Sequence, residues 1–280
     1  MERLYLLAPA LLLLAITLAG LLVFGMLTLL GRQPEVRGAK HNELFGAFFG
    51  RWLVWMLTPV ERLLVGRVSA NAITALSLVL CIIAGIGAAT GHLVVAMWTF
   101  CTAGILDALD GRIARLSGEQ SKAGALFDSV SDRWGELAAF TGFVWFLRES
   151  PWLIAAMGAI GGSMMVSYTR ARAEGLGVDL RGGMMQRAER IVLVCLGTLI
   201  AAWFAAVGDF ATAVPILGVT LSICAVSSTA TAISRWVQAY RVLAARATKR
   251  PVVETPAPAA TTGPMFPVPA KLRESAELGL

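Results

Sequence analysis

Seven apolar stretches, each long enough to cross a bilayer as a helix, dominate this 280-residue chain. A transmembrane helix needs about 20 mostly apolar residues, and the bilayer interior admits only structures that pair their backbone polar groups internally. Charged residues make up 15% of the chain, against about 25% in an average soluble domain. The sequence therefore predicts an all-α polytopic membrane protein. The stretches cover residues 4–30, 70–90, 92–111, 125–147, 152–171, 190–208 and 211–233.

Lysine and arginine are distributed unevenly among the segments that connect these stretches. The connections after the first, third and fifth stretches and the segment after the seventh are basic, whereas the alternate connections offer only Arg148. Basic loops stay on the cytoplasmic side of a membrane. The pattern predicts a protein of the cytoplasmic membrane, with its N-terminus outside and its C-terminus inside. It also accounts for the net charge of +6 without a nucleic-acid partner, for which the sequence contains no motif.

Two segments differ from the rest. Residues 44–66 mix aromatic residues and leucines with Arg51, Glu61 and Arg62, which is typical of an amphipathic helix lying in the membrane interface; the alternative is an ordinary connecting helix. The end of the chain is rich in Pro, Ala and Thr, cannot build a core and is expected to be disordered. We therefore divide the chain into an extra transmembrane anchor (1–40), an interfacial helix (41–68), a six-span core (69–247) and a tail (248–280).

Four aspartates lie at the ends of the third and fourth stretches that face each other along the chain. Asp107 and Asp110 are three residues apart, and Asp128 and Asp132 are four apart, so each pair occupies one face of its helix. A short polar loop joins the two helices, which should therefore be antiparallel neighbours with converging carboxylates. Carboxylate oxygens suit Mg²⁺ or Mn²⁺, and four carboxylates can bridge two such ions.

Small and basic residues accompany the aspartates. Gly111 follows Asp110 directly, and Gly124 precedes Asp128 by four residues. Glycine at such positions allows a ligand to approach the backbone closely. Ala114 is small and on the same helix face, and Arg115 offers a fixed positive charge for phosphate. This set favours a nucleotide or diphosphate ligand.

The complete pattern D-x2-D-G-x2-A-R-x8-G-x3-D-x3-D, at 107–132, is similar to the signature of the CDP-alcohol phosphotransferases, also called CDP-alcohol phosphatidyltransferases. The resemblance covers about 60–245 and implies the six-helix core of that family. It also implies an enzyme of phospholipid biosynthesis, homodimeric as is common in the family. Such an enzyme transfers a phosphatidyl or related lipid-phosphate group from a CDP-linked lipid, such as CDP-diacylglycerol, to the hydroxyl of a small polar acceptor and releases CMP.

The resemblance also implies roles for individual residues. Asp107, Asp110 and Asp128 would be ligands of a two-metal centre, and Asp132 would be both a ligand of the second ion and the general base. The family often has Asn-x-x-Thr at the start of its first core span, which matches Asn71 and Thr74; a helix N-cap by Ser69 or Asn71 is an equally good interpretation of that segment. The residues assigned to the CDP site are Asn71, Thr74, Asp107, Gly111, Ala114, Arg115 and Gly124.

The acceptor is predicted from the basic residues near the cytoplasmic face. SYTRARAEGLG at 167–177 and QRAER at 186–190 resemble the branch of the family that uses inositol phosphate, the phosphatidylinositol-phosphate synthases and their archaeal-lipid relatives. By that resemblance Arg170, Arg190 and Arg235 would hold the acceptor phosphate, which charge-assisted hydrogen bonds favour. The branch often has proline where this chain has Ala188.

Three alternatives stay open. Glycerol 3-phosphate is the second acceptor, because it also carries a phosphate, and serine is the third. Each of the three arginines could instead be ordinary positive charge of a cytoplasmic loop. The last alternative is that the protein is a non-enzymatic ion transporter, because carboxylates inside membranes often mark ion pathways. Transporters usually place them near the midplane, not at helix ends.

Overall fold

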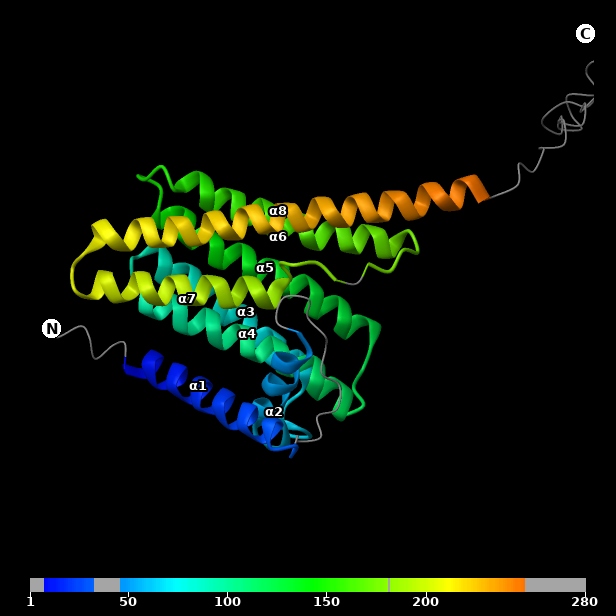
Figure 1. The fold of residues 1–280 in the computed structure, drawn as a ribbon, viewed down its shortest axis with the longest axis horizontal. Helices are drawn as coiled ribbons and strands as arrows, with labels where there is room; N and C mark the ends of the chain where they lie inside the picture. The colour runs from blue at the N-terminus through cyan, green and yellow to red at the C-terminus, as the bar shows by residue number, and fades with distance from the viewer. Residues whose placement is uncertain (1–7, 33–45, 181, 250–280) are drawn as a thin grey trace, which may run out of the picture. The chain divides into compact units, whose positions relative to one another are not determined.

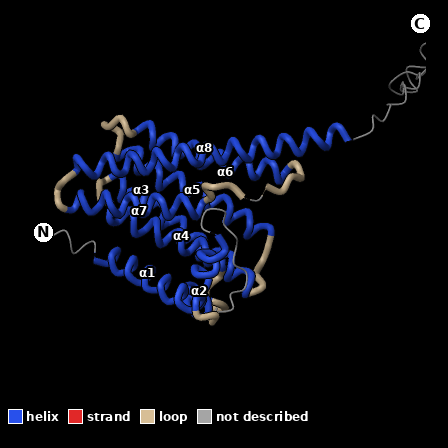
Figure 2. The backbone as a smooth tube through the Cα atoms, in the orientation of Figure 1, coloured by secondary structure: helices blue, strands red, loops and turns tan. Residues whose placement is uncertain are grey.

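The computed structural model describes residues 8–32, 46–180 and 182–249, and within these ranges the secondary structure consists of helices and turns (Figures 1 and 2). The predicted all-helical fold is confirmed, and each helix stands where an apolar or amphipathic segment was predicted. The chain divides into two units, Met1–Tyr240 and Arg241–Leu280, and the described part of the second is the end of the last helix. The helices are α1 (Ala8–Leu29), α2 (Gly46–Leu64), α3 (Ala70–Ala89), α4 (Leu93–Leu116), α5 (Lys122–Phe146), α6 (Leu153–Gly175), α7 (Arg187–Ala206) and α8 (Phe210–Lys249).

Four helices of the described chain, α3, α4, α7 and α8, are long and apolar enough to cross a membrane. The described apolar part of α1 covers Leu14–Leu29 and is shorter than the length expected of a span. The helices α5 and α6 have 25 and 23 residues and carry charged residues at the ends that we predicted to be cytoplasmic. Seven crossings therefore remain a prediction, of which four satisfy the length and hydropathy expected of a span.

Short polar sequences determine where the helices of the site begin and end. Ser69 caps α3 by accepting a hydrogen bond from the Ala72 amide, and Ser121 caps α5 by accepting one from the Gly124 amide. Gly118 follows α4 with a φ of 69°, a conformation that costs glycine little and that turns the chain toward α5. Only a short connection separates the end of α4 from the start of α5. The two helices are therefore antiparallel neighbours.

The core of the first unit is built around α3, which packs against both α4 and α5, while α4 also packs against α7 and α5 against α6. Small residues allow this close approach: a Cβ atom on Gly142 would overlap the carbonyl group of Gly85, and one on Gly135 would lie 3.1 Å from the Cβ of Cys81. Phe100, Phe140 and Phe143 fill the apolar centre. This packing fixes the spacing between the two helices that carry the aspartates.

The helix α2 buries one face against the core. Val54, Leu57 and Glu61 are buried on that face, and Glu61 forms a two-pronged ion pair with Arg112 of α4. Phe24 of α1 packs its ring against Phe48 of α2. The segment predicted to be amphipathic is thus a helix with one buried face, and an ion pair joins it to α4. The predicted domain boundaries at 40/41, 68/69 and 247/248 remain predictions. Residues 248 and 249 of the predicted tail still belong to α8, and the rest of that tail lies outside the described residues.

Candidate metal centre and active site

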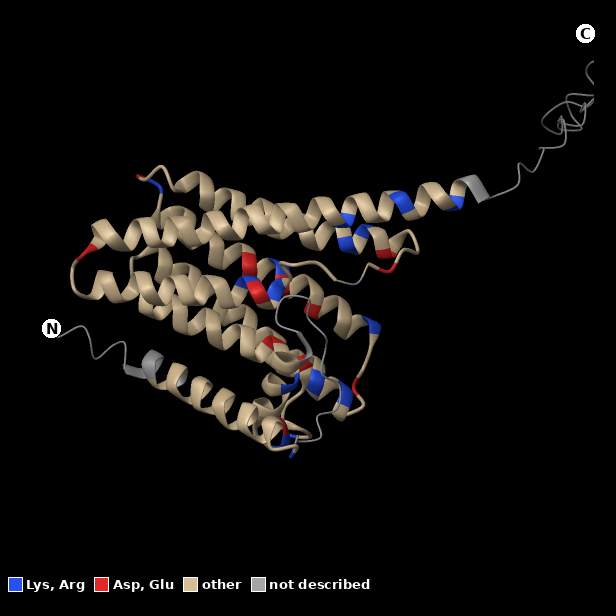
Figure 3. Cartoon of the chain, viewed as in Figure 1, with Lys and Arg blue, Asp and Glu red and all other residues tan. Residues whose placement is uncertain are grey.

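Three of the four predicted aspartates converge. Asp107 and Asp110 lie on α4 and Asp128 lies on α5, and one carboxylate oxygen from each is within 4.8 Å of the others. Asp110 is 3% exposed, and the other two are partly exposed. Figure 3 shows that charged residues of α4, α5 and α7 gather toward one end of these helices. The convergence predicted from the spacing is therefore confirmed for this trio.

A hydroxyl group from a third helix orients the most buried carboxylate. The Thr74 side chain of α3 donates a hydrogen bond to Asp110 Oδ2 at 2.6 Å, and the Gly111 amide donates to Asp110 Oδ1. Outer partners of this kind hold a ligating carboxylate in place. Thr74, predicted to lie near the nucleotide, thus contacts a predicted metal ligand directly.

The remaining residues predicted for the CDP site lie around the same helix ends. The side-chain oxygen of Asn71 would lie 3.4 Å from a Cβ on Gly124, so α3 and the first turn of α5 meet there. Ser69, not Asn71, caps α3, which leaves the Asn71 amide available to a ligand or to solvent. On α4, Arg115 reaches back over Gly111, where a Cβ would lie 3.5 Å from its guanidinium group. Ala114 is half-buried on the same helix.

Asp132 lies next to the trio but has a different partner. Its Oδ1 is 2.6 Å from Arg187 Nη1, and the same nitrogen contacts Asp107 Oδ1. Arg187 opens α7, so this contact joins α4, α5 and α7. Arg187 was expected to lie near the aspartates with the other arginines of its segment but was assigned no role. Its R-x-x-R spacing to Arg190 in QRAER was the signal that places both arginines on one helix face.

Arg190 occupies the protein interior. Its guanidinium group donates to both carboxylate oxygens of Glu136 at 2.6 and 2.9 Å and to the Met185 carbonyl at 3.2 Å. Arg190 is 1% exposed and Glu136 is 2% exposed. Sequence reasoning missed Glu136, although it follows Asp132 by four residues and so lies on the face of α5 that carries the aspartates.

Like Arg190, the other two arginines predicted to hold the acceptor phosphate have partners other than the four aspartates. Arg170 is exposed and pairs with Glu174, one turn along α6, at 2.8 Å. Arg235 of α8 is buried and donates to the Gly182 carbonyl at 2.7 Å and to the Val166 carbonyl at 3.1 Å. Arg190 and Arg235 therefore both bond to the loop that joins α6 and α7.

The chemistry of the donor set fits a divalent metal ion. Asp107, Asp110 and Asp128 present hard carboxylate oxygens at one point, as Mg²⁺ and Mn²⁺ prefer. Asp110 has an oriented outer partner in Thr74, and the first turn of α5 leaves its glycine backbone close to the site. These residues can hold such an ion, and Asp132 lies beside them to complete the predicted set of four.

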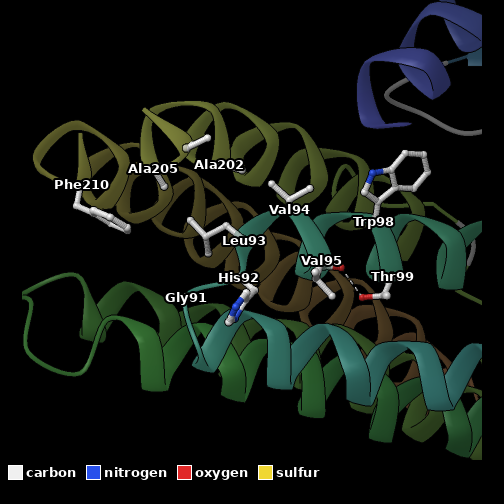
Figure 4. Close-up of a pocket in the computed structure, with 11 residues that line it drawn as sticks. Gly91, His92, Leu93, Val94, Val95, Trp98, Thr99, Ala202, Ala205 and Phe210 are labelled. Carbon is white, nitrogen blue, oxygen red and sulfur yellow. Dashed lines mark hydrogen bonds between the residues drawn. The ribbon is translucent and has the colours of Figure 1, made fainter. Parts of the chain in front are cut away.

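A separate cavity lies at the other end of α4. It has a volume of about 450 Å³ and lies between the turn that joins α3 to α4 and the end of α7 (Figure 4). Leu93, Val94, Trp98 and Phe210 give it an apolar lining. Because it is remote along α4 from Asp107 and Asp110, it is not part of the acidic site.

Comparison with known proteins identifies a matching family. The model of the family CDP-alcohol phosphatidyltransferase matches residues 67–224, which is more than half of the chain. A phosphatidylinositol phosphate synthase from Streptomyces avermitilis is 32% identical over 229 residues, covering 74% of this chain and 86% of that protein. For the synthases from Mycobacteroides abscessus and Mycobacterium bovis the match spans 61% and 62% of the relative's length.

Solved structures agree with this result. The Mycobacterium tuberculosis phosphatidylinositol phosphate synthase with CDP-DAG bound has a TM-score of 0.56 to this chain and 29% sequence identity, covering 66% of this chain and 94% of that one. The same protein in complex with manganese and citrate gives a TM-score of 0.56, covering 65% of this chain and 88% of that one. The matched part of this chain thus shares the fold of that synthase.

Proposed function

Because this chain belongs to the CDP-alcohol phosphatidyltransferase family, we propose that it transfers the phosphatidyl or a related lipid-phosphate group of a CDP-linked lipid, such as CDP-diacylglycerol, to a small phosphorylated alcohol. The observation that carries the proposal is the convergence of the carboxylates of Asp107, Asp110 and Asp128 from two neighbouring helices, α4 and α5. They belong to a complete family signature, and Asp132 stands beside them. The protein is an integral membrane protein, so its lipid substrate and its site share one bilayer.

Different residues of the chain have different roles in the proposed reaction. Two divalent ions, Mg²⁺ or Mn²⁺, held by Asp107, Asp110, Asp128 and Asp132, would neutralise charge on the diphosphate and stabilise the departing CMP. Thr74 keeps the Asp110 carboxylate oriented. Gly111, Ala114 and Gly124 leave room for the nucleotide beside Asn71, and Arg115 pairs with a donor phosphate.

Asp132 takes the proton in this mechanism. The acceptor hydroxyl attacks the lipid-linked phosphorus, the bond from that phosphorus to CMP breaks, and the hydroxyl proton passes to the Asp132 carboxylate. Asp132 is partly exposed and next to the trio, so an incoming hydroxyl can reach it. The reaction needs no covalent enzyme intermediate.

The favoured acceptor is myo-inositol phosphate, with glycerol 3-phosphate as the alternative and serine third. The support is that relatives of similar sequence are phosphatidylinositol phosphate synthases and that basic residues surround the loop between α6 and α7. Arg170, Arg190 and Arg235 are proposed to hold the acceptor phosphate. Of the three, Arg170 is exposed, whereas Arg190 and Arg235 would act from beneath the loop whose carbonyls they bind.

The placement in the cell completes the proposal. The basic loops predict that the N-terminus lies outside the cytoplasmic membrane and that the acidic site opens at its cytoplasmic face, where soluble phosphorylated alcohols are available. We expect the protein to work as a homodimer, as is common in the family.

A competition among acceptors tests the substrate. The purified full chain would receive CDP-diacylglycerol and Mg²⁺ with myo-inositol 1-phosphate, glycerol 3-phosphate, serine or inositol, and the lipid product would be identified by mass spectrometry. We expect kcat/KM to be at least about tenfold higher for myo-inositol 1-phosphate than for serine or inositol, because a charge-assisted phosphate contact contributes about 1.5–3 kcal/mol. Glycerol 3-phosphate carries the same phosphate, so we expect a lower kcat/KM for it only because its alcohol differs from the inositol ring. Preference for glycerol 3-phosphate or for an uncharged acceptor would contradict this assignment and leave the family reaction standing. A transporter would release no CMP with any of the four.

A further inference from the structure

Arg187 lies between two of the clustered aspartates, where positive charge offsets their repulsion. Its Nη1 contacts Asp107 Oδ1 and lies 2.6 Å from Asp132 Oδ1, so one guanidinium group bridges two of the four carboxylates proposed to bind metal. Aspartates this close would repel one another without positive charge between them. Arg187 supplies that charge from α7, a helix that contributes no carboxylate to the set.

The hydrogen bonds of Arg187 differ from those of Arg190, one turn along the same helix. Arg190 is enclosed, with Glu136 and the Met185 carbonyl as partners that take no part in metal binding. Arg187 keeps 19% of its side chain exposed, and its Nε, though buried, has no hydrogen-bond partner among the described residues. Both of its ion-pair partners there, Asp107 and Asp132, are carboxylates proposed to bind metal.

Asp107 Oδ1 cannot bind a divalent ion and keep its full ion pair with Arg187 at the same time. A divalent ion shared by Asp107, Asp110 and Asp128 needs the Asp107 carboxylate, and Asp132 is the proposed ligand of the second ion. We propose that Arg187 is a resident counter-cation that occupies Asp107 and Asp132 in the metal-free protein and must release them when the metal binds. The inference rests on the proposed metal site and not on the identity of the acceptor.

The consequence is that Arg187 weakens metal binding while it stabilises the metal-free site. Removing it would leave carboxylates that attract a divalent ion without first breaking two charge-assisted contacts. We therefore expect Arg187→Gln to bind Mn²⁺ about tenfold or more tightly than the original chain. Arg187→Lys, which keeps the charge but lacks the planar fork, should fall between the two.

The test is a Mn²⁺ titration of the full chain, freed of metal with chelator and followed by electron paramagnetic resonance, which reports free Mn²⁺. Arg133→Gln is the matched control, because Arg133 is also a cation beside the site but lies 3.9 Å from Asp132 Oδ2 with 37% of its side chain exposed. An exposed pair of that kind contributes little, so the control should shift the Kd for Mn²⁺ by no more than about threefold.

A second readout separates the counter-cation role from a merely structural one. Without metal, Arg187→Gln should have a lower Tm than the original chain, and Mn²⁺ should raise its Tm by more. If Arg187→Gln binds Mn²⁺ no more tightly than the original chain or the Arg133→Gln control, the counter-cation role is wrong although the metal site stands. If none of the proteins binds Mn²⁺, the metal site fails and this inference fails with it; the transfer reaction is judged separately by CMP release.

Discussion

Replacing Asp132 with asparagine should lower the rate of CMP release by about a thousandfold or more while nucleotide binding is largely kept. A positioned general base contributes about a hundredfold to ten-thousandfold, and the substitution also removes one charge proposed to hold the second ion. The amide keeps the size of the side chain and can still accept a hydrogen bond from Arg187, so the packing of α5 against α7 should persist. The measurement is the rate of CMP release at saturating CDP-diacylglycerol and acceptor, together with CDP binding by calorimetry.

Asp209→Asn is the matched control for this prediction. Asp209 lies just before α8 and accepts a hydrogen bond from the Thr212 amide at 3.0 Å, a capping role that asparagine also fills. The same chemical change there should leave CMP release unchanged. Near-normal turnover by the Asp132 variant would remove the base assignment and direct attention to the other carboxylates.

The second large effect concerns stability. Glu136→Gln should destabilise the protein by about 3–5 kcal/mol, because it removes the charge partner of a buried arginine. Arg190 is 1% exposed and has only the Met185 carbonyl besides Glu136 among its described hydrogen-bond partners. Since a folded domain is stable by about 5–15 kcal/mol in all, the loss should appear as a marked fall in the Tm of the purified chain.

Two comparisons make this second prediction decisive. Glu174→Gln breaks the exposed pair with Arg170 on α6 and should change stability by less than about 0.5 kcal/mol. Combining Glu136→Gln with Arg190→Gln removes both buried charges and should recover much of the Tm lost in the single variant. Equal small effects for Glu136 and Glu174 would show that the pair with Arg190 does not support the fold.

The sequence predicted those features of the site that depend on spacing along one helix or across one short loop. The intervals from Asp107 to Asp110 and from Asp128 to Asp132 determine which helix face carries them, and five residues between α4 and α5 leave few ways to arrange two helices. The extents of the helices were predicted less well. For example, α4 continues to Leu116 and α7 begins at Arg187, beyond the predicted stretches that ended at 111 and began at 190. Hydropathy identifies only the apolar part of a helix that lies in the bilayer, and it misses the polar turns that extend the helix beyond it.

The contacts of the arginines were beyond sequence reasoning. QRAER shows two arginines on one face of a helix, but only the packing of α7 against α4 decides that Arg187 contacts Asp107 while Arg190 pairs with Glu136 of α5. A long side chain has many rotamers, and its partner depends on which carboxylate the tertiary structure brings within reach. For the same reason Arg190, predicted to hold the acceptor phosphate near the cytoplasmic face, lies in a buried ion pair, and its proposed contact with the acceptor depends on the loop between α6 and α7.

The metal dependence of CMP release tests the proposed metal-assisted transfer most directly. The purified full chain, stripped with EDTA, would be given CDP-diacylglycerol and myo-inositol 1-phosphate, and CMP would be measured before and after adding Mg²⁺ or Mn²⁺. We expect no CMP release in EDTA, full release when either ion is restored, and none when the acceptor is omitted. Release of CMP at an unchanged rate in EDTA, or no release with any acceptor in the presence of metal, would contradict the proposed metal-assisted transfer.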